Sequence, residues 1–142
     1  MKDLHNRIHP VPLIAPVAAR TDNTAIVSAI IDRLNYESLE LVLVTGTNTD
    51  ANATFAVLVE DGNDPSLSDN AAVADEELLG TEAQAGFTFA DDVECRKIGY
   101  VGSKRYVRLT VTPSGNDSGN IFIAGIALLG NSNSSPTANP PQ

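Results

Sequence analysis

The chain has 142 residues, a formal net charge of −9 and a single cysteine. This length fits one domain with its own hydrophobic core, and one cysteine excludes an intramolecular disulfide. The negative charge argues against nucleic acid as a partner, because phosphates require a basic surface. The N-terminus does not resemble a secretory signal and no apolar run is long enough to span a membrane, so we expect a protein assembled in the cytoplasm.

Residues 1–24 are expected to form an extended arm. Pro10, Pro12 and Pro16 remove backbone donors and favour extended conformations at the residues before them. Apolar residues alternate with these prolines, which is unusual for a free linker. We therefore predict that the arm lies along its own domain or along a neighbouring subunit. The candidate partner-binding residues in it are Ile8, Pro10, Val11, Leu13, Ile14 and Val17.

Three short runs that follow, 25–32, 38–45 and 54–60, are predicted to be strands. The first is short and dominated by β-branched residues, which favours a strand over a helix. In the second, every other residue from 39 to 43 is leucine, and the opposite face carries Glu40, Val42 and Val44. Because this opposite face is partly apolar, we expect a central strand or one covered by a partner.

The middle of the chain is acidic. Between Arg33 and Arg96 there is no Lys or Arg, whereas 14 Asp and Glu residues lie there. We expect a solvated surface that keeps the protein soluble, with a basic partner or a cation as the alternative. Residues 61–70 contain fragments of a calcium loop, but Gly62 and Pro65 do not fit the register of an EF-hand.

Residues 71–81 are predicted to be an irregular connection, and strands are expected to resume at 86–90 and 94–100. The stretch 96–113 then predicts a β-hairpin, because Gly102 and Ser103 match a two-residue type II′ loop. Arg105, Tyr106 and Arg108 form a candidate binding spot on it. The alternative is that both arginines pair with carboxylates on an adjacent strand.

The run 120–129 is the most apolar one and is expected in the middle of a sheet. Residues 131–142 are rich in Ser, Asn and Pro, which predicts a loosely held tail. Seven or eight short strands without an ordinary helix predict an all-β fold, an antiparallel β-sandwich of jelly-roll type. The predicted organisation is an arm at 1–24, a sandwich at 25–130 and a tail at 131–142.

No motif for catalysis, cofactor binding or metal binding is present in the sequence. His5 and His9 have the spacing of a metal pair on a helix, but Pro10 argues against that helix. There is no nucleophile elbow, no phosphate-binding loop and no dinucleotide-binding glycine motif. We therefore predict a protein that is not an enzyme and that uses no cofactor or metal.

Several segments together resemble a group of small structural proteins of tailed bacteriophages and prophages, usually encoded beside the major capsid protein. The resemblance spans residues 1 to about 130 and has no catalytic residues to transfer. It is carried by a Gly46 loop and by residues 31–39 (IDRLNYESL), 59–63 (VEDGN), 78–80 (LLG), 98–109 (IGYVGSKRYVRL) and 126–130 (IALLG).

The resemblance implies a component of the virion, a decoration (cement) protein on the outer surface of the capsid, assembled in the bacterial cytoplasm. Its expected partners are the major capsid protein and further copies of itself, as a trimer or dimer, and neither nucleic acid nor a membrane. Two alternatives remain at this point. One is a tail or head-tail connector subunit, and the other is a glycan-binding module, for which three tyrosines and no Trp offer a thin aromatic platform.

Overall fold

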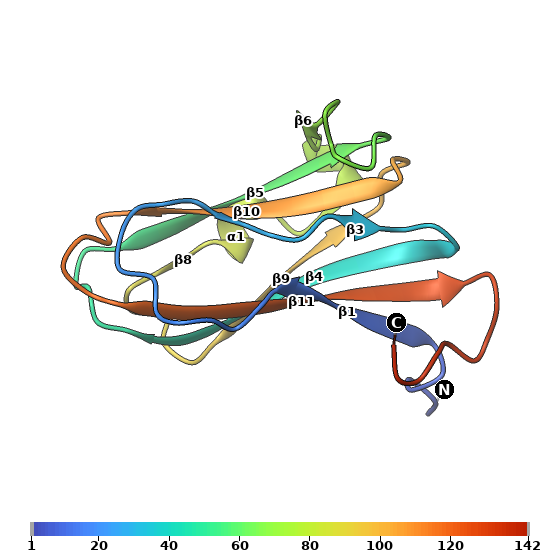
Figure 1. The fold of residues 1–142 in the computed structure, drawn as a ribbon, viewed down its shortest axis with the longest axis horizontal. Helices are drawn as coiled ribbons and strands as arrows, with labels where there is room; N and C mark the ends of the chain where they lie inside the picture. Colours follow the sequence, from blue (N-terminus) through green and yellow to red (C-terminus); the bar gives the residue numbers. More distant parts are fainter. Residues whose placement is uncertain (1, 142) are drawn as a thin grey trace.

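The computed structural model describes residues 2–141, which fold into two antiparallel sheets packed face to face (Figure 1). The first sheet, sheet A, has the strand order β1 (Ile8–Ile14), β11 (Ile121–Ser132), β4 (Tyr36–Asn48), β9 (Cys95–Tyr100) and β7 (Leu78–Leu79). In sheet B, β10 (Tyr106–Ser114) lies between β5 (Thr54–Gly62) and the short strands β2 (Ile26–Val27) and β3 (Ile31–Asp32). The strands β6 (Ala71–Ala72) and β8 (Phe87–Thr88) pair with the other edge of β5. The predicted antiparallel β-sandwich is confirmed.

The strand pairing has the nested pattern of a jelly roll. The first strand, β1, pairs with the last, β11, and the interrupted second strand, β2 with β3, pairs with β10. Further inward, β4 pairs with β9, and β5 pairs with β6 and β8. This is one long hairpin rolled into two sheets, as in jelly-roll domains. Within residues 2–141 the chain forms two short helices, η1 (Asp75–Glu77) and α1 (Glu82–Ala85).

The core lies between the inner faces of the two sheets. Alternate residues of each long strand point into it, as the period-2 pattern predicts, and Leu41, Val107 and Leu109 are completely buried. The apolar strand β11 lies between β1 and β4, which confirms the prediction of a central position.

The predicted hairpin across Gly102 is wrong, because β9 belongs to sheet A and β10 to sheet B. The chain crosses between the sheets over the buried ring of Tyr100, whose hydroxyl donates to Asp61 (2.6 Å) and accepts the backbone N–H of Lys104 (3.1 Å). A Cβ at Gly102 would lie 2.4 Å from this hydroxyl oxygen. Glycine is therefore needed here for space, not for a positive φ.

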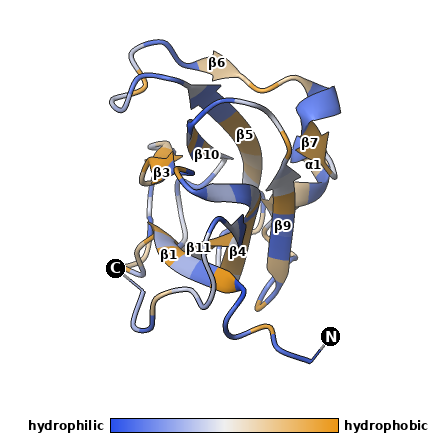
Figure 2. Cartoon of the chain, turned by 90° about the vertical axis from the view of Figure 1, so that its right-hand side faces the viewer, coloured by the Kyte–Doolittle hydropathy of each residue, from blue (hydrophilic) through white to orange (hydrophobic). Residues whose placement is uncertain are grey.

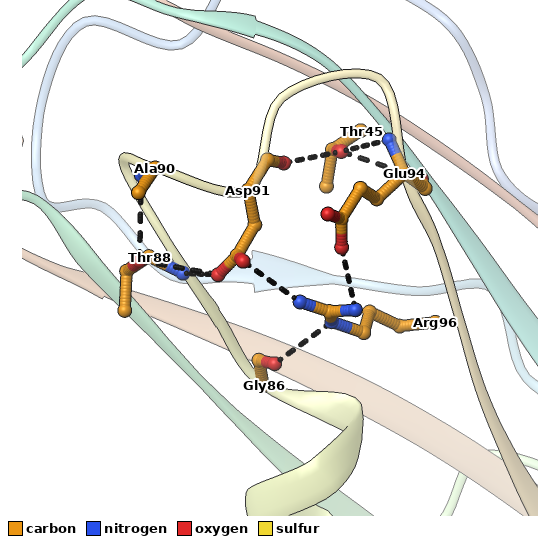
Figure 3. A network of polar contacts seen from close by, with 7 residues as sticks. All are labelled: Thr45, Gly86, Thr88, Ala90, Asp91, Glu94 and Arg96. Atoms are coloured by element: carbon orange, nitrogen blue, oxygen red, sulfur yellow. Dashed lines mark hydrogen bonds and ion pairs between the residues drawn. The ribbon is translucent and has the colours of Figure 1, made fainter.

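Many of the acidic residues between Arg33 and Arg96 hold loops in place. In the segment that joins β8 to β9, the Asp91 carboxylate accepts the N–H of Thr88 and pairs with Arg96 (3.0 Å), which also pairs with Glu94 (2.6 Å) (Figure 3). The hydroxyl of Thr45 on β4 accepts the N–H of Glu94 (3.0 Å) and ties the segment to sheet A. The hydrogen bond from Thr88, aided by Arg96, lowers the pKa of Asp91.

Asp50 also holds loops in place, on the side of β4 that faces β11. Its buried carboxylate accepts the backbone N–H groups of Ser118 (2.8 Å) and Asp117 (3.0 Å), and so joins two loops that are far apart in the sequence. These hydrogen bonds, the one from Ser118 first, lower the pKa of Asp50.

A stability contribution from Asp50 is expected to depend on pH. Because the folded-state pKa is below the unfolded one, the contribution is present above the unfolded value and is lost as the pH falls through the folded value. Urea midpoints measured from about pH 5 to about pH 2.5 should therefore fall less steeply for Asp50→Asn than for the unmodified protein. The exposed Asp75 provides the control, and equal slopes for Asp50→Asn and Asp75→Asn would contradict the expectation.

Candidate partner-binding surfaces

The first candidate surface is a groove at the open edge of the sandwich, where β1 and β3 end the two sheets. It has a volume of about 510 Å³, and we call it the edge groove. Val11 and Pro12 of β1 line one wall, and Ile30 and Leu34 line the other. Tyr36 also lines it, with its ring stacked on that of His9 (5.4 Å between centroids). The groove stays open because β2 and β3 are too short to cover this edge.

The residues predicted as the binding arm are divided among four environments. Ile8–Ile14 forms β1 and pairs with β11, so this segment lies along its own domain. Leu13 and Ile14 are core residues, exposed by 2% and 5%. Val11 lines the edge groove, and the exposed Val17 lies beyond the end of β1. Ile8 and Pro10 occupy outward positions on sheet A. Truncating this arm would therefore remove a strand, so its surface is better tested with point variants.

Both predicted arginines pair with carboxylates on neighbouring strands. Arg105 forms two hydrogen bonds of 2.8 Å with Asp32, which lines the edge groove, and its guanidinium lies 4.9 Å from the ring centroid of Tyr106. This contact lowers the pKa of Asp32. Arg108 pairs with Glu60 on β5 (2.8 Å). Arg105 therefore lies beside the edge groove, because its partner Asp32 lines that groove. Arg108 lies on the side of β10 that faces β5, away from the groove.

The tail residues also contribute to this region. Asn133 donates its N–H to the carbonyl of Asn35, and Thr137 donates its N–H to Asn6 and its hydroxyl to Ile8. Thr137 is buried, and Ala138 lines the edge groove. Residues near both ends of the chain therefore meet at one side of the molecule (Figure 1).

The second candidate surface is the outward side of sheet A, which we call the outer face. Its exposed apolar side chains are large: Leu79 is exposed by 59%, Phe122 by 50%, Ile126 by 44% and Val44 by 43%. The strand register also places Ile8, Pro10, Val42, Cys95 and Leu128 on this side. Figure 2 shows the apolar colour of β7 beside the alternation of β9.

Only β4 showed this surface in the sequence, through its partly apolar second face. The outward side of β11 is also apolar. Phe122, Ile126 and Leu128 face outward, whereas the other face of this strand lies in the core. Because nearly every residue from 121 to 129 is apolar, the sequence of this strand does not show which of its two faces is exposed. This is why the sequence did not reveal the extent of the outer face.

Two opposite charges interrupt the outer face. Glu40 lies opposite Gly99 and Lys97 lies opposite Val42 in the β4–β9 register, so the two side chains are diagonal neighbours. Partial burial raises the pKa of Glu40, and Lys97 opposes this shift. Within residues 2–141 they are the only charged residues at the outward register positions of β1, β11, β4 and β9.

Among the described residues, no three His, Cys, Asp or Glu side chains are grouped as a metal site would require. The helices within residues 2–141 are also too short to cross a membrane. Cys95 is an exposed thiol on the outer face.

No protein-family model matches the sequence, and no curated protein matches it significantly. The structure is similar to that of the PBSX exported protein XepA, with a TM-score of 0.54 and 12% identity over 88% of this chain. The chain spans 37% of the length of that protein. At this identity the likeness shows a shared fold.

Two other solved structures have lower TM-scores. Infectious bursal disease virus, Gx strain, gives 0.47 at 15% identity over 92% of this chain and 34% of that one. The CBM22-1 and GH10 modules of Clostridium thermocellum xylanase 10B, complexed with xylohexaose, give 0.45 at 10% identity over 95% of this chain and 28% of that one.

Proposed function

We propose that this chain is a non-enzymatic structural protein of a tailed-phage virion, which binds the outer surface of the capsid and stabilises it. The observation that supports this is the presence of two separate uncovered apolar surfaces on one small domain, the edge groove and the outer face. Large exposed apolar patches on soluble domains mark sites of interaction. A domain with two of them is suited to connect neighbours within an assembly.

The edge groove is the surface we assign to the capsid. It combines apolar walls from β1 and β3 with the Arg105–Asp32 ion pair at its side, so it offers both apolar contact and a polar boundary. Burial of apolar surface contributes roughly 25 cal/mol per Å². Many copies on one shell add such contacts together, so that moderate individual affinities reinforce the whole capsid. The resemblance to phage structural proteins and the jelly-roll fold, which occurs in viral capsid domains, are consistent with this role.

The net charge fits a position on the outside of the shell. A chain with a net charge of −9 is repelled by packaged DNA and does not compete for it. The basic residues already counted in this net charge include Arg96, Arg105 and Arg108, which are paired with carboxylates in loops and strands, so the excess negative charge comes from the other carboxylates.

Co-sedimentation with capsids tests the proposal. Purified protein is mixed with capsids of the same phage that were assembled without it, and the pellet is quantified against protein concentration. We expect saturable binding with a fixed number of copies per capsid, and a higher temperature of capsid disruption in its presence. Absence of binding would overturn the proposal, and rings formed by the protein alone would favour a connector instead.

The glycan-binding alternative has weaker support. Tyr100 and Tyr106 are buried, and Tyr36 is half-buried and stacked on His9, so the tyrosines do not form an exposed platform.

A further inference from the structure

We infer that the outer face of sheet A is a two-fold interface between two copies of this chain. The inference concerns self-association in the absence of capsids, so it stands or falls independently of capsid binding. Three observations support it: the size of the apolar face, the arrangement of its two charges, and the protection of the neighbouring sheet edge.

The first observation is the size of the face. The five strands of sheet A range from two residues in β7 to 13 in β4, and at about 3.3 Å per residue and about 4.8 Å between strands they present roughly 600 Å² of surface. Side chains such as Phe122 and Leu79 corrugate this surface and increase its accessible area. The total approaches the roughly 800 Å² per partner of a standard stable interface. Leaving it in water would cost a soluble protein both solubility and stability.

The second observation is the charge pattern, which is complementary to itself. In a two-fold interface, residue i of one copy meets residue j of the other, and the reverse contact also forms. Glu40 and Lys97 lie diagonally on adjacent strands and form no ion pair within 4.0 Å in one copy. Across a two-fold axis between β4 and β9, Glu40 of each copy can pair with the partner's Lys97. A partner with a uniformly acidic or basic surface would leave one of these charges buried without a counterion.

The third observation excludes association through the neighbouring edge. β1 is the exposed edge strand of sheet A, and its Pro10 and Pro12 have no N–H group to donate. Prolines at such positions prevent another strand from extending the sheet. The outer face carries one Glu and one Lys, so two copies can meet there without a net charge repulsion.

Charge reversal with rescue is the decisive experiment. Sedimentation velocity of the full chain should show a dimer at micromolar concentrations. Glu40→Lys and Lys97→Glu should each weaken dimerisation at least tenfold, because each puts like charges opposite one another. The double variant should restore the dimer to within about threefold of the original affinity, since the pair is re-formed in reverse. Circular dichroism of each variant verifies the fold.

Thr112→Asp on the outward side of sheet B is the matched control and should remain dimeric. A monomer at all concentrations, a trimer, or a double variant no better than the single ones would overturn the inference. Leu34→Asp in the edge groove should also remain dimeric, which separates this interface from the one assigned to the capsid.

Cys95 provides a second readout without any substitution, because the only thiol of the chain lies on the outer face opposite Val44. Its reaction with a maleimide should slow at least fivefold as the concentration rises through the dimerisation range. In the Glu40→Lys variant the rate should stay high at all concentrations. A dimer in which Cys95 reacts as fast as in the monomer would show that the copies meet through a different face.

Discussion

Leu34→Asp is expected to lower the affinity for capsids by about 100-fold or more while leaving the domain folded. Leu34 is exposed by 53% on the wall of the edge groove, so its replacement removes little from the core. In the bound state, however, the new carboxylate would be buried against an apolar surface without a partner, which costs several kcal/mol. The measurement is co-sedimentation with capsids over a concentration series.

Thr112→Asp introduces the same charge on the outward side of sheet B and is expected to bind capsids as the unmodified protein does. If Leu34→Asp bound with unchanged affinity, the assignment of the groove to the capsid would be wrong even if the protein itself still decorated the shell. A second groove variant, Val11→Asp, should reproduce the loss, because Val11 lies on the opposite wall. Val11 also packs partly against the core, so circular dichroism must first show that this variant is folded.

Tyr100→Phe is expected to destabilise the fold by about 1–3 kcal/mol, although the ring itself is kept. The lost hydroxyl donates to the buried carboxylate of Asp61 and accepts the N–H of Lys104, so its removal leaves both groups without this partner. Burial and the hydrogen bond to Asp61 also raise the pKa of Tyr100 strongly, which keeps this donor protonated. Urea unfolding at neutral pH measures the effect.

Tyr36→Phe is the matched control, because Tyr36 is half-buried and stacks on His9 through its ring. Its loss of a hydroxyl is expected to change stability by less than about 0.5 kcal/mol. Equal effects at the two positions would show that the hydroxyl of Tyr100 has no special part in the crossing between the sheets.

The error at Gly102 shows why turn chemistry did not predict the topology. A glycine followed by serine between two β-rich runs is typical of a hairpin, and the same residues also suit a chain that must pass closely over a buried ring. The distinction depends on Tyr100, whose hydroxyl is bound by Asp61 from another sheet. That contact joins residues 39 positions apart and leaves no local pattern in the sequence.

The candidate binding residues also show this difference between local patterns, which the sequence contains, and contacts between distant segments, which it does not. The apolar arm, the paired arginines and the apolar second face of residues 38–45 were all visible in the sequence. The sequence did not show which of these residues lie together in space. Val11, Leu34 and Ala138 line one groove only because β1, the segment after β3 and the tail lie at the same edge of the sandwich. Leu13 and Val11 are two positions apart in one strand, yet one enters the core and the other lines the groove.

The sequence by itself determined the fold class, the positions of the strands β4, β5, β9, β10 and β11 and the central place of residues 120–129, because period-2 alternation and apolar content are local properties that each strand carries alone. It did not predict the strand β1 in residues 1–24 or the short strands β6 and β7 in residues 71–81. Only the tertiary structure decided which strands share a sheet, which apolar face is covered and which is left in water. These depend on contacts between distant segments, where the preference of any single residue is small and the pairing of whole strands prevails.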